Sequence, residues 1–186
     1  HTNFSMEAIE QTWNGNSTSV TTTERCTATI SRNGDLVHRM YLEVDGRARA
    51  EENINAQSII DIEVEIGGQK IDKHSGQYMN IFRYLTEPNS NGWGGTDGTL
   101  FQNMSGMSGS VATVNDYKTF VPLTFWFCRN PGLALPLIAL QYHEVKIILN
   151  YNFSRGYTAI TGNKLWADYI YLDTDWLETR LTFNYK

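Results

Sequence analysis

The 186-residue sequence has few cysteines, few prolines and little charge. Its two cysteines, Cys26 and Cys128, are too few for a disulfide scaffold, and we expect them to be buried free thiols from a reducing compartment. No apolar run has the length of a membrane span and no signal peptide is present, so membrane insertion is not expected. Because the chain starts at His1, we expect a processed product or an excised fragment.

Charge excludes a second group of functions. The net charge is −5 and no block of basic residues occurs, which is a poor footprint for binding nucleic acid or an anionic membrane. The 41% hydrophobic and 19% charged content excludes a disordered chain. Aromatic residues make up 12%, and together with plentiful Thr, Ile and Val they favour an all-β domain.

The segment Phe120–Tyr151 predicts the centre of the fold. It contains two expected strands, one around Phe125–Cys128 and one over Val145–Tyr151, separated by the turn Asn130-Pro131-Gly132 and an irregular apolar connection around Pro136. We predict that its large apolar side chains form the core, namely Phe125, Phe127, Val145, Ile147 and Leu149.

The rest of the chain is rich in strand patterns. Strands are expected at Ile9–Trp13, Thr21–Ile30, Leu36–Val44, Ile60–Ile66, Leu165–Leu172 and Leu177–Tyr185. Asn33-Gly34 predicts a hairpin turn, Asp45–Asn55 a charged loop, and the spacing of apolar residues one helix within Asp72–Leu85. The pattern predicts an eight-stranded antiparallel jelly-roll sandwich with one short inserted helix, as a single domain over residues 1–186.

Five segments together resemble a known family. They are HTNFSMEAIEQTWNG at the start, ISRNGDLVHRMYLEV, IEVEIGGQKIDKHSGQYMNIFRYLT, PLTFWFCRNPGLALPLIALQYHEVKI and LWADYIYLDTD. They resemble the N-terminal jelly roll of the major capsid proteins of nucleocytoplasmic large DNA viruses, the phycodnavirus, iridovirus and mimivirus group. Two features depart from that family: the chain has length for one jelly roll instead of two, and Trp176-Leu177 replaces the charged run that usually follows LDTD.

The resemblance implies a structural virion protein. A capsid jelly roll of this family is expected to self-associate into homotrimeric capsomers of an icosahedral shell, to contact neighbouring capsomers and minor capsid proteins, and to be assembled in the host-cell cytoplasm. The long Asn89–Asn115 segment is the expected contact region, with Trp93, Phe101, Met104 and Met107 as candidate interface residues. The alternative is a monomeric carbohydrate-binding (lectin-like) jelly roll in which Trp93 and other loop aromatics stack on sugar rings.

Residues that could perform chemistry occur without the spacing that chemistry needs. His38, His74 and His143 lack metal-ligand spacing, and Ser108 sits in SGMSGS, where the nucleophile motif requires glycine at position 110. Asp61, Glu63 and Glu65 are expected on a solvated strand face. We therefore expect no enzyme activity, catalytic residue, metal or cofactor. Four sequons make Asn3, Asn16, Asn103 and Asn152 candidate glycosylation sites, a property known for some capsid proteins of this group.

Overall fold

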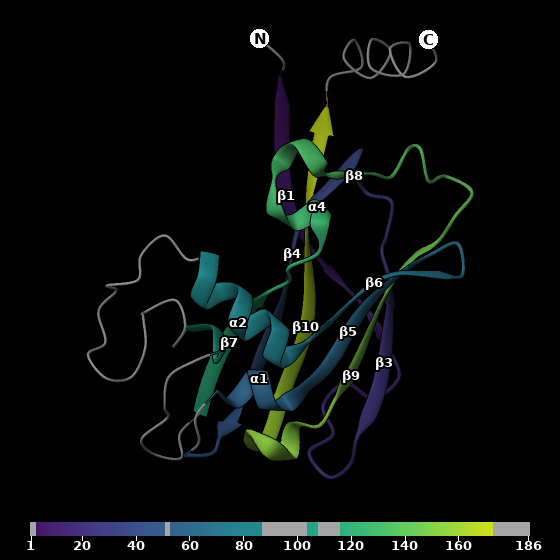
Figure 1. Cartoon of the computed structure of the whole chain (residues 1–186). Helices are drawn as coiled ribbons and strands as arrows, with labels where there is room; N and C mark the ends of the chain where they lie inside the picture. The colour runs from purple at the N-terminus through teal and green to yellow at the C-terminus, as the bar shows by residue number, and fades with distance from the viewer. Residues whose placement is uncertain (1–2, 51–52, 87–103, 108–115, 173–186) are drawn as a thin grey trace.

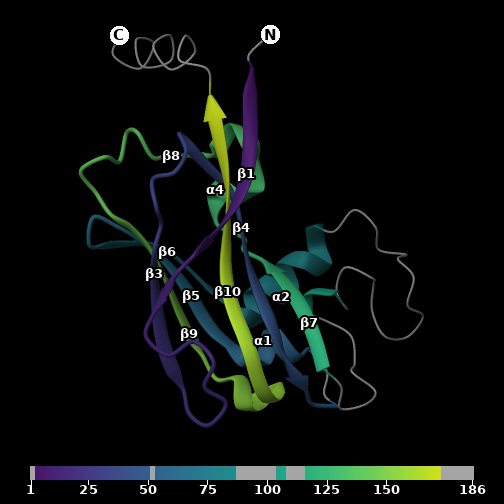
Figure 2. The ribbon, with the colours of Figure 1, turned by 180° about the vertical axis from the view of Figure 1, so that it is seen from behind.

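Two antiparallel sheets form the body of the protein in a computed structural model that describes residues 3–50, 53–86, 104–107 and 116–172. The first sheet has the order β1-β10-β4-β7, and its strands are β1 (Phe4–Gln11), β10 (Tyr157–Leu172), β4 (Leu36–Ala48) and β7 (Asp116–Pro122), with the short β8 (Leu135–Pro136) also beside β4. The second sheet has the order β2-β3-β9-β5-β6, and its strands are β2 (Trp13–Asn14), β3 (Glu24–Thr29), β9 (Val145–Tyr151), β5 (Ile59–Ile66) and β6 (Gln69–Ser75). Seen from behind in Figure 2, the first sheet lies in front of the second.

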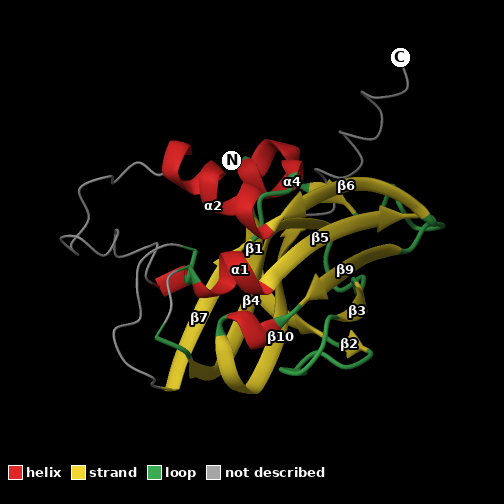
Figure 3. Cartoon of the chain, turned by 60° about the horizontal axis from the view of Figure 1, so that its bottom comes forward, coloured by secondary structure: helices red, strands yellow, loops and turns green. Residues whose placement is uncertain are grey.

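The described helices are short and follow the strands. They are α1 (Ile54–Ser58), α2 (Gly76–Thr86) and α4 (Trp126–Arg129), with single 3-10 turns at η2 (Pro131–Leu133) and η3 (Phe153–Arg155). Figure 3 shows α2 and α4 next to each other at one side of the sheets. The guanidinium of Arg129 in α4 lies 5.0 Å from the ring centroid of Phe82 in α2, so side chains join the two helices directly.

The predicted all-β sandwich is confirmed, and its strand order is consistent with a jelly roll. The predicted count of eight is not met, because the described part of the chain contains ten strands. Two of these, β2 and β8, are only two residues long. The expected strand Leu177–Tyr185 lies outside the described residues. Two longer strands were not predicted. They are β6, whose side chains are mostly exposed and so lack a clear apolar alternation, and β7, which comes just before the strand predicted around Phe125–Cys128.

The strand predicted around Phe125–Cys128 is wrong. Residues Trp126–Arg129 form the one-turn helix α4. Burial of Phe125 and Phe127 is compatible with either a helix or a strand. An apolar run this short therefore does not distinguish the two structures. The rings of Phe125 and Phe127 stack with centroids 5.7 Å apart, and the Phe127 carbonyl lies 3.1 Å from Nδ1 of His38 in β4. This bond fixes α4 against the first sheet.

Two predictions made from local sequence are wrong, because partners far away in the sequence decide the structure of these segments. Asn33-Gly34 does not make a hairpin, since β3 belongs to the second sheet and β4 to the first. The turn instead carries the chain from one sheet to the other. Nor is Asp45–Asn55 a charged loop throughout: β4 continues to Ala48, and Asn55 is fully buried in α1.

The predicted core is confirmed. Phe125, Phe127, Ile147 and Leu149 are fully buried and Val145 is 4% exposed. They join inward-facing side chains of both sheets in one cluster. The strands predicted by the cleanest alternation, Ile60–Ile66 and Val145–Tyr151, lie next to each other as β5 and β9 at the middle of the second sheet.

A buried polar network ties α1 to the first sheet. The side chain of Asn55 donates to the carbonyl of Ser105 and to Oγ1 of Thr119, both at 2.8 Å, and its Oδ1 accepts from the hydroxyl of Tyr157 at 2.8 Å. Its backbone N–H also donates to the carbonyl of Gly106. Burial raises the pKa of Tyr157 well above its usual value, so its hydroxyl keeps the proton that it donates.

The sequence predicts a solvated strand face for Asp61, Glu63 and Glu65, but the outer face of the second sheet is partly covered. Glu63 is only 4% exposed because Lys70 and Lys73 cover it, with Nζ atoms 2.8 and 3.0 Å from its carboxylate. Lys73 also pairs with Asp61 at 3.0 Å. Burial would raise the pKa of Glu63, but the hydrogen bonds from the two lysines outweigh it and hold that pKa below its usual value.

Glu63→Gln should lower the free energy of unfolding at pH 7 by about 1 kcal/mol, because the lysines lose a charged acceptor. A carboxylate whose pKa is lowered by folding stabilises above its unfolded pKa of about 4.3 and loses that contribution as pH falls through its folded pKa. The difference in the free energy of unfolding between wild type and variant, measured by urea unfolding, should therefore become smaller below about pH 4. Glu144→Gln, at a side chain that is 66% exposed, is the control and should change little. A gap of the same size at pH 7 and pH 3 would contradict this account.

Candidate interaction surface

Helix α2 begins where β6 ends. The Ser75 hydroxyl accepts a hydrogen bond from the backbone N–H of Tyr78 at 3.1 Å, which caps the first turn. Near the last turn, the Thr86 hydroxyl donates to the carbonyl of Phe82 at 2.7 Å. The helix predicted within Asp72–Leu85 is thus confirmed, starting at Gly76.

The apolar side chains of α2 mostly face outward. Its only buried residues are Gly76 and Met79. The exposed ones, which we call the helix face, are Tyr78 at 40%, Ile81 at 58%, Tyr84 at 60% and Leu85 at 80% exposure. Soluble monomers seldom present several large apolar side chains together, and such patches mark sites of association. The helix face is therefore the first candidate contact surface.

A half-open cavity of about 700 Å³ lies beside α2, where the edge strand β7 ends at Pro122. We call it the arginine pocket, because three arginines from three elements line it: Arg39 of β4, Arg83 of α2 and Arg129 of α4. Asp168 of β10 is the one acidic residue among the described lining residues, and Met40, Phe82, Phe120 and Leu123 contribute apolar surface. Burial raises the pKa of Asp168, while Arg39 opposes that rise.

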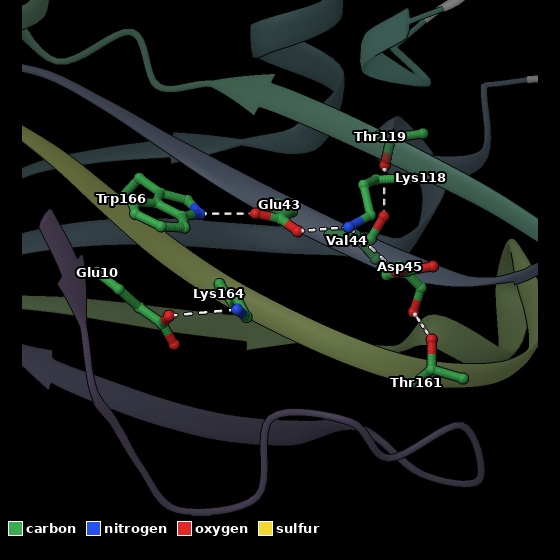
Figure 4. Close-up of polar contacts among 9 residues, drawn as sticks. All are labelled: Glu10, Glu43, Val44, Asp45, Lys118, Thr119, Thr161, Lys164 and Trp166. Atoms are coloured by element: carbon green, nitrogen blue, oxygen red, sulfur yellow. Dashed lines mark hydrogen bonds and ion pairs between the residues drawn. The ribbon is translucent and has the colours of Figure 1, made fainter. Parts of the chain in front are cut away.

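A row of aromatic side chains continues from the pocket across the outer face of the first sheet. Tyr41 stacks on Trp166 of the paired strand with centroids 6.3 Å apart, and Phe120 meets Tyr41 edge-on at 6.3 Å. Figure 4 shows Glu43 between Trp166 and Lys118, accepting bonds of 2.8 Å from the indole and 2.9 Å from the ammonium group. The bonds from Lys118 and Trp166 hold the pKa of Glu43 below its usual value. This face is ordered by its own ion pairs.

The candidate interface residues fall into different places. Met104 is 53% exposed and lines the arginine pocket. Met107 is 1% exposed and packs in the core, so we remove it from the candidate interface residues: its apolar surface is already used within the chain. Trp93 and Phe101 lie outside the described residues. The helix face was missed as a surface because helical spacing shows a common side of a helix but not what that side packs against.

The sequons differ in how their asparagines are engaged. Asn3 and Asn16 are exposed, and Asn16 Oδ1 accepts a bond from the backbone of Thr18. Asn152 is half-buried and caps η3: its Oδ1 accepts from the N–H and hydroxyl of Ser154, and its Nδ2 lies 3.4 Å from the Thr23 hydroxyl. Asn103 falls outside the described ranges. Glycosylation at these positions stays a prediction.

The residues considered for chemistry do not converge. His38 lies under α4, His74 of β6 stacks on Tyr78 at 4.9 Å, and His143 packs beside the β5–β6 turn at Gly67. Burial lowers the pKa of His74 despite the carboxylate of Asp72 at 3.3 Å. Within residues 3–50, 53–86, 104–107 and 116–172, no cluster of three or more His, Cys, Asp or Glu side chains is placed to hold a metal ion. Ser108 is not among the residues that the structure describes.

The cysteines are the free thiols that their sequence context predicts. Cys26 is buried and Cys128 is partly buried. Burial raises the pKa of each thiol to about 12, which keeps both in the unreactive protonated form at neutral pH. None of the helices in the described part of the chain is long and apolar enough to cross a membrane.

Sequence comparison places these features in a family. The profile described as "Major capsid protein N-terminus" matches residues 1–173. The chain is 45% identical over 192 residues to the major capsid protein of Pyramimonas orientalis virus, covering 94% of this chain and 46% of that relative. It is 37% identical to the major capsid protein of Paramecium bursaria Chlorella virus 1, covering 94% of this chain and 41% of that protein. The chain thus spans about half the length of the curated relatives it matches.

The fold comparison agrees with the sequence comparison. The structure matches a crystal structure of PBCV-1 VP54, fitted into a cryo-electron-microscopy reconstruction of the virophage Sputnik, with a TM-score of 0.74 and 32% identity. The match covers 94% of this chain and 44% of that one. A second match, to a quasi-atomic model of the PBCV-1 virus capsid, has a TM-score of 0.68 and 33% identity. The chain belongs to the family of major capsid protein N-terminal domains.

Proposed function

We propose that the protein is a structural component of a large DNA virus capsid and acts by burying surface against copies of itself. Membership of the major capsid protein family supports this role, and so do the similar folds of the PBCV-1 capsid protein. The observation that carries the self-association is the helix face, where Ile81 and Leu85 are 58% and 80% exposed. A stable interface buries about 1,200–2,000 Å² in total, and its centre is typically apolar and aromatic.

The proposed assembly is a homotrimer that contacts neighbouring capsomers and minor capsid proteins in an icosahedral shell. Closed rotational symmetry is the usual arrangement of identical chains, and the resemblance to the capsid family points to a three-fold axis. In this proposal the protein resides in the virion, is assembled in the host cytoplasm, and has no enzymatic role. A single jelly roll over residues 1–186 is part of the same proposal. Trp93, Phe101 and Met104 stay candidate contact residues beside the helix face.

Light scattering after size exclusion, over a wide concentration range, tests the proposal. The mass should rise with concentration toward three times the 21.2 kDa of one chain. The double substitution Ile81→Glu and Leu85→Glu should keep the mass at one chain without changing the far-ultraviolet circular dichroism, because buried charges oppose association. Tyr142→Glu, at a side chain that is 87% exposed outside α2, is the matched control and should still associate.

One chain at every concentration would contradict self-association. If that result came with sugar binding that Trp93→Ala abolishes, it would favour the monomeric carbohydrate-binding alternative. Association that survives the double substitution would move the contact away from the helix face.

A further inference from the structure

A three-fold assembly requires two different contact surfaces on each chain. A surface that meets the same surface of a second copy gives a two-fold dimer, whereas a ring of three copies joins one surface to a different one. The helix face can be only one of these two surfaces. The other must lie elsewhere on the molecule, where apolar side chains are exposed.

The register of four strands places a second group of apolar side chains on one face of the first sheet. Met6 of β1 lies opposite Ile170 of β10, and Ile170 lies opposite Leu36 of β4. Leu36 in turn lies opposite Pro136 of β8. Residues opposite each other on paired strands point to the same side of a sheet. A second row, two residues further along β1 and β10, completes what we call the sheet-end patch, whose members are Phe4, Met6, Leu36, Pro136, Ile170 and Leu172.

The sheet-end patch faces away from the core. The neighbouring residues of the same strands, Val37, Leu135 and Tyr169, are buried in the core on the opposite face of the sheet. In the patch, Phe4 is 65% exposed and Met6 is 50% exposed. Large apolar side chains that lie together on a surface mark a site of association.

The helix face and the sheet-end patch belong to opposite edges of the first sheet. In the order β1-β10-β4-β7, the edge strand β1 carries Phe4 and Met6. Helix α2 lies beside the other edge strand, β7, where Arg83 donates to the carbonyl of Pro122 at 3.4 Å. Figure 2 shows α2 and β7 on one side of the molecule and β1 on the other. A second copy can therefore present its helix face to this patch while its own patch stays open.

Acidic groups beside the sheet-end patch decide between two partners. The carboxylate of Glu7 accepts a hydrogen bond from the Tyr171 hydroxyl at 3.2 Å, and that of Asp35 accepts one from the backbone N–H of Leu172 at 2.8 Å. Two patches that met each other would bring these carboxylates of both copies together, and like charges oppose association. Helix α2 contains no acidic residue, so it approaches the patch without that repulsion.

We propose that the sheet-end patch receives the helix face of a second copy of this chain in a head-to-tail contact. The inference rests on the proposed self-association and names the surface that the helix face meets. In this contact Ile81 and Leu85 lie over Phe4 and Met6, as a helix packs its apolar side against a sheet. Because the two joined surfaces differ, repetition of the contact can close a ring.

Mixing two variants tests the head-to-tail contact. The helix-face variant carries Ile81→Glu and Leu85→Glu, and the patch variant carries Phe4→Glu and Met6→Glu. In light scattering after size exclusion, each variant alone should stay at the mass of one chain, because each lacks one of the two required surfaces. Their equimolar mixture should reach the mass of two chains and no more, since the intact helix face of one variant meets the intact patch of the other.

A milder substitution and a control variant separate loss of contact from loss of folding. Phe4→Ser with Met6→Ser should shift association to an about tenfold higher concentration, while the far-ultraviolet circular dichroism stays that of wild type. Tyr142→Glu, at a side chain that is 87% exposed in the connection between β8 and β9, should associate like wild type.

The outcomes distinguish this contact from the proposed function. If wild type associates but the mixture of the two variants stays at one chain, the head-to-tail contact is overturned and self-association stands. The same conclusion follows if both patch variants associate like wild type, or if the helix-face variant forms dimers alone. A wild type that stays at one chain at every concentration would contradict the proposed function itself, and this contact with it.

Discussion

Phe127→Ala should lower the free energy of unfolding by about 3–5 kcal/mol, a large part of the stability of an ordinary domain. Phe127 is fully buried and touches aromatic rings on two sides, with Phe125 stacked at 5.7 Å and Trp126 edge-on at 5.1 Å. Its removal loses the transfer free energy of the ring and leaves a cavity beside His38, which α4 covers. Urea unfolding followed by tryptophan fluorescence gives the measurement.

Phe4→Ala is the matched control for this prediction, because Phe4 is 65% exposed on β1. The same truncation there removes little buried surface and should cost less than about 0.5 kcal/mol. A loss below about 1 kcal/mol for Phe127→Ala would mean that the side chain is not enclosed.

Asn55→Ala should cost about 2–4 kcal/mol, for a different reason. The substitution removes almost no apolar surface but takes away the amide that bonds the carbonyl of Ser105 and the hydroxyls of Thr119 and Tyr157. The two hydroxyls keep only the longer contact with each other, at 3.3 Å, and Thr119 its 3.3 Å bond to the carbonyl of Val44. A buried group that loses a hydrogen bond costs about 1–3 kcal/mol. Because Asn55 links α1 with residues 104–107 and with the first sheet, the loss should also speed local opening there, which hydrogen exchange can detect.

Asn33→Ala is the control for this substitution. Asn33 is exposed and its side chain donates to the nearby Ser31 hydroxyl at 3.1 Å, so the change should stay within about 0.5 kcal/mol. A cost below about 1 kcal/mol at Asn55 would show that the network is replaced by water.

The alternation of apolar and polar residues predicted the central strands correctly, because a strand with one buried face must place an apolar residue at every second position. In β5 and β9 the inner face must be apolar, and Ile62, Val64, Ile147 and Leu149 are buried as that rule requires. The helix α2 was predicted by the same reasoning with a different period. What failed was short or non-local: α4 is a single turn, and the Asn33-Gly34 turn says nothing about which sheet receives the next strand.

The contact surfaces could not be predicted from local sequence for a related reason. The arginine pocket combines β4, α2, β7, α4 and β10, so its residues share no spacing that a motif search could find. Met104 and Met107 illustrate the limit, since two similar residues three positions apart end in opposite environments. Composition identified interface-type residues, but only the fold decides which of them reach the surface.

The pairing of β1 with β10 has a consequence for how the protein is made. The first residue of β1, Phe4, lies opposite Leu172, the last of β10, and both ends of the described chain lie at the same end of the sheet (Figure 1). At a synthesis rate of about 5–20 residues per second, β1 waits on the order of 10–30 s for its partner. β10 also lies between β1 and β4, so the first sheet stays divided until that strand has left the ribosome. Interrupted chains therefore expose open strand edges to chaperones and proteases, and any lattice built from this fold can draw only on chains translated beyond Leu172.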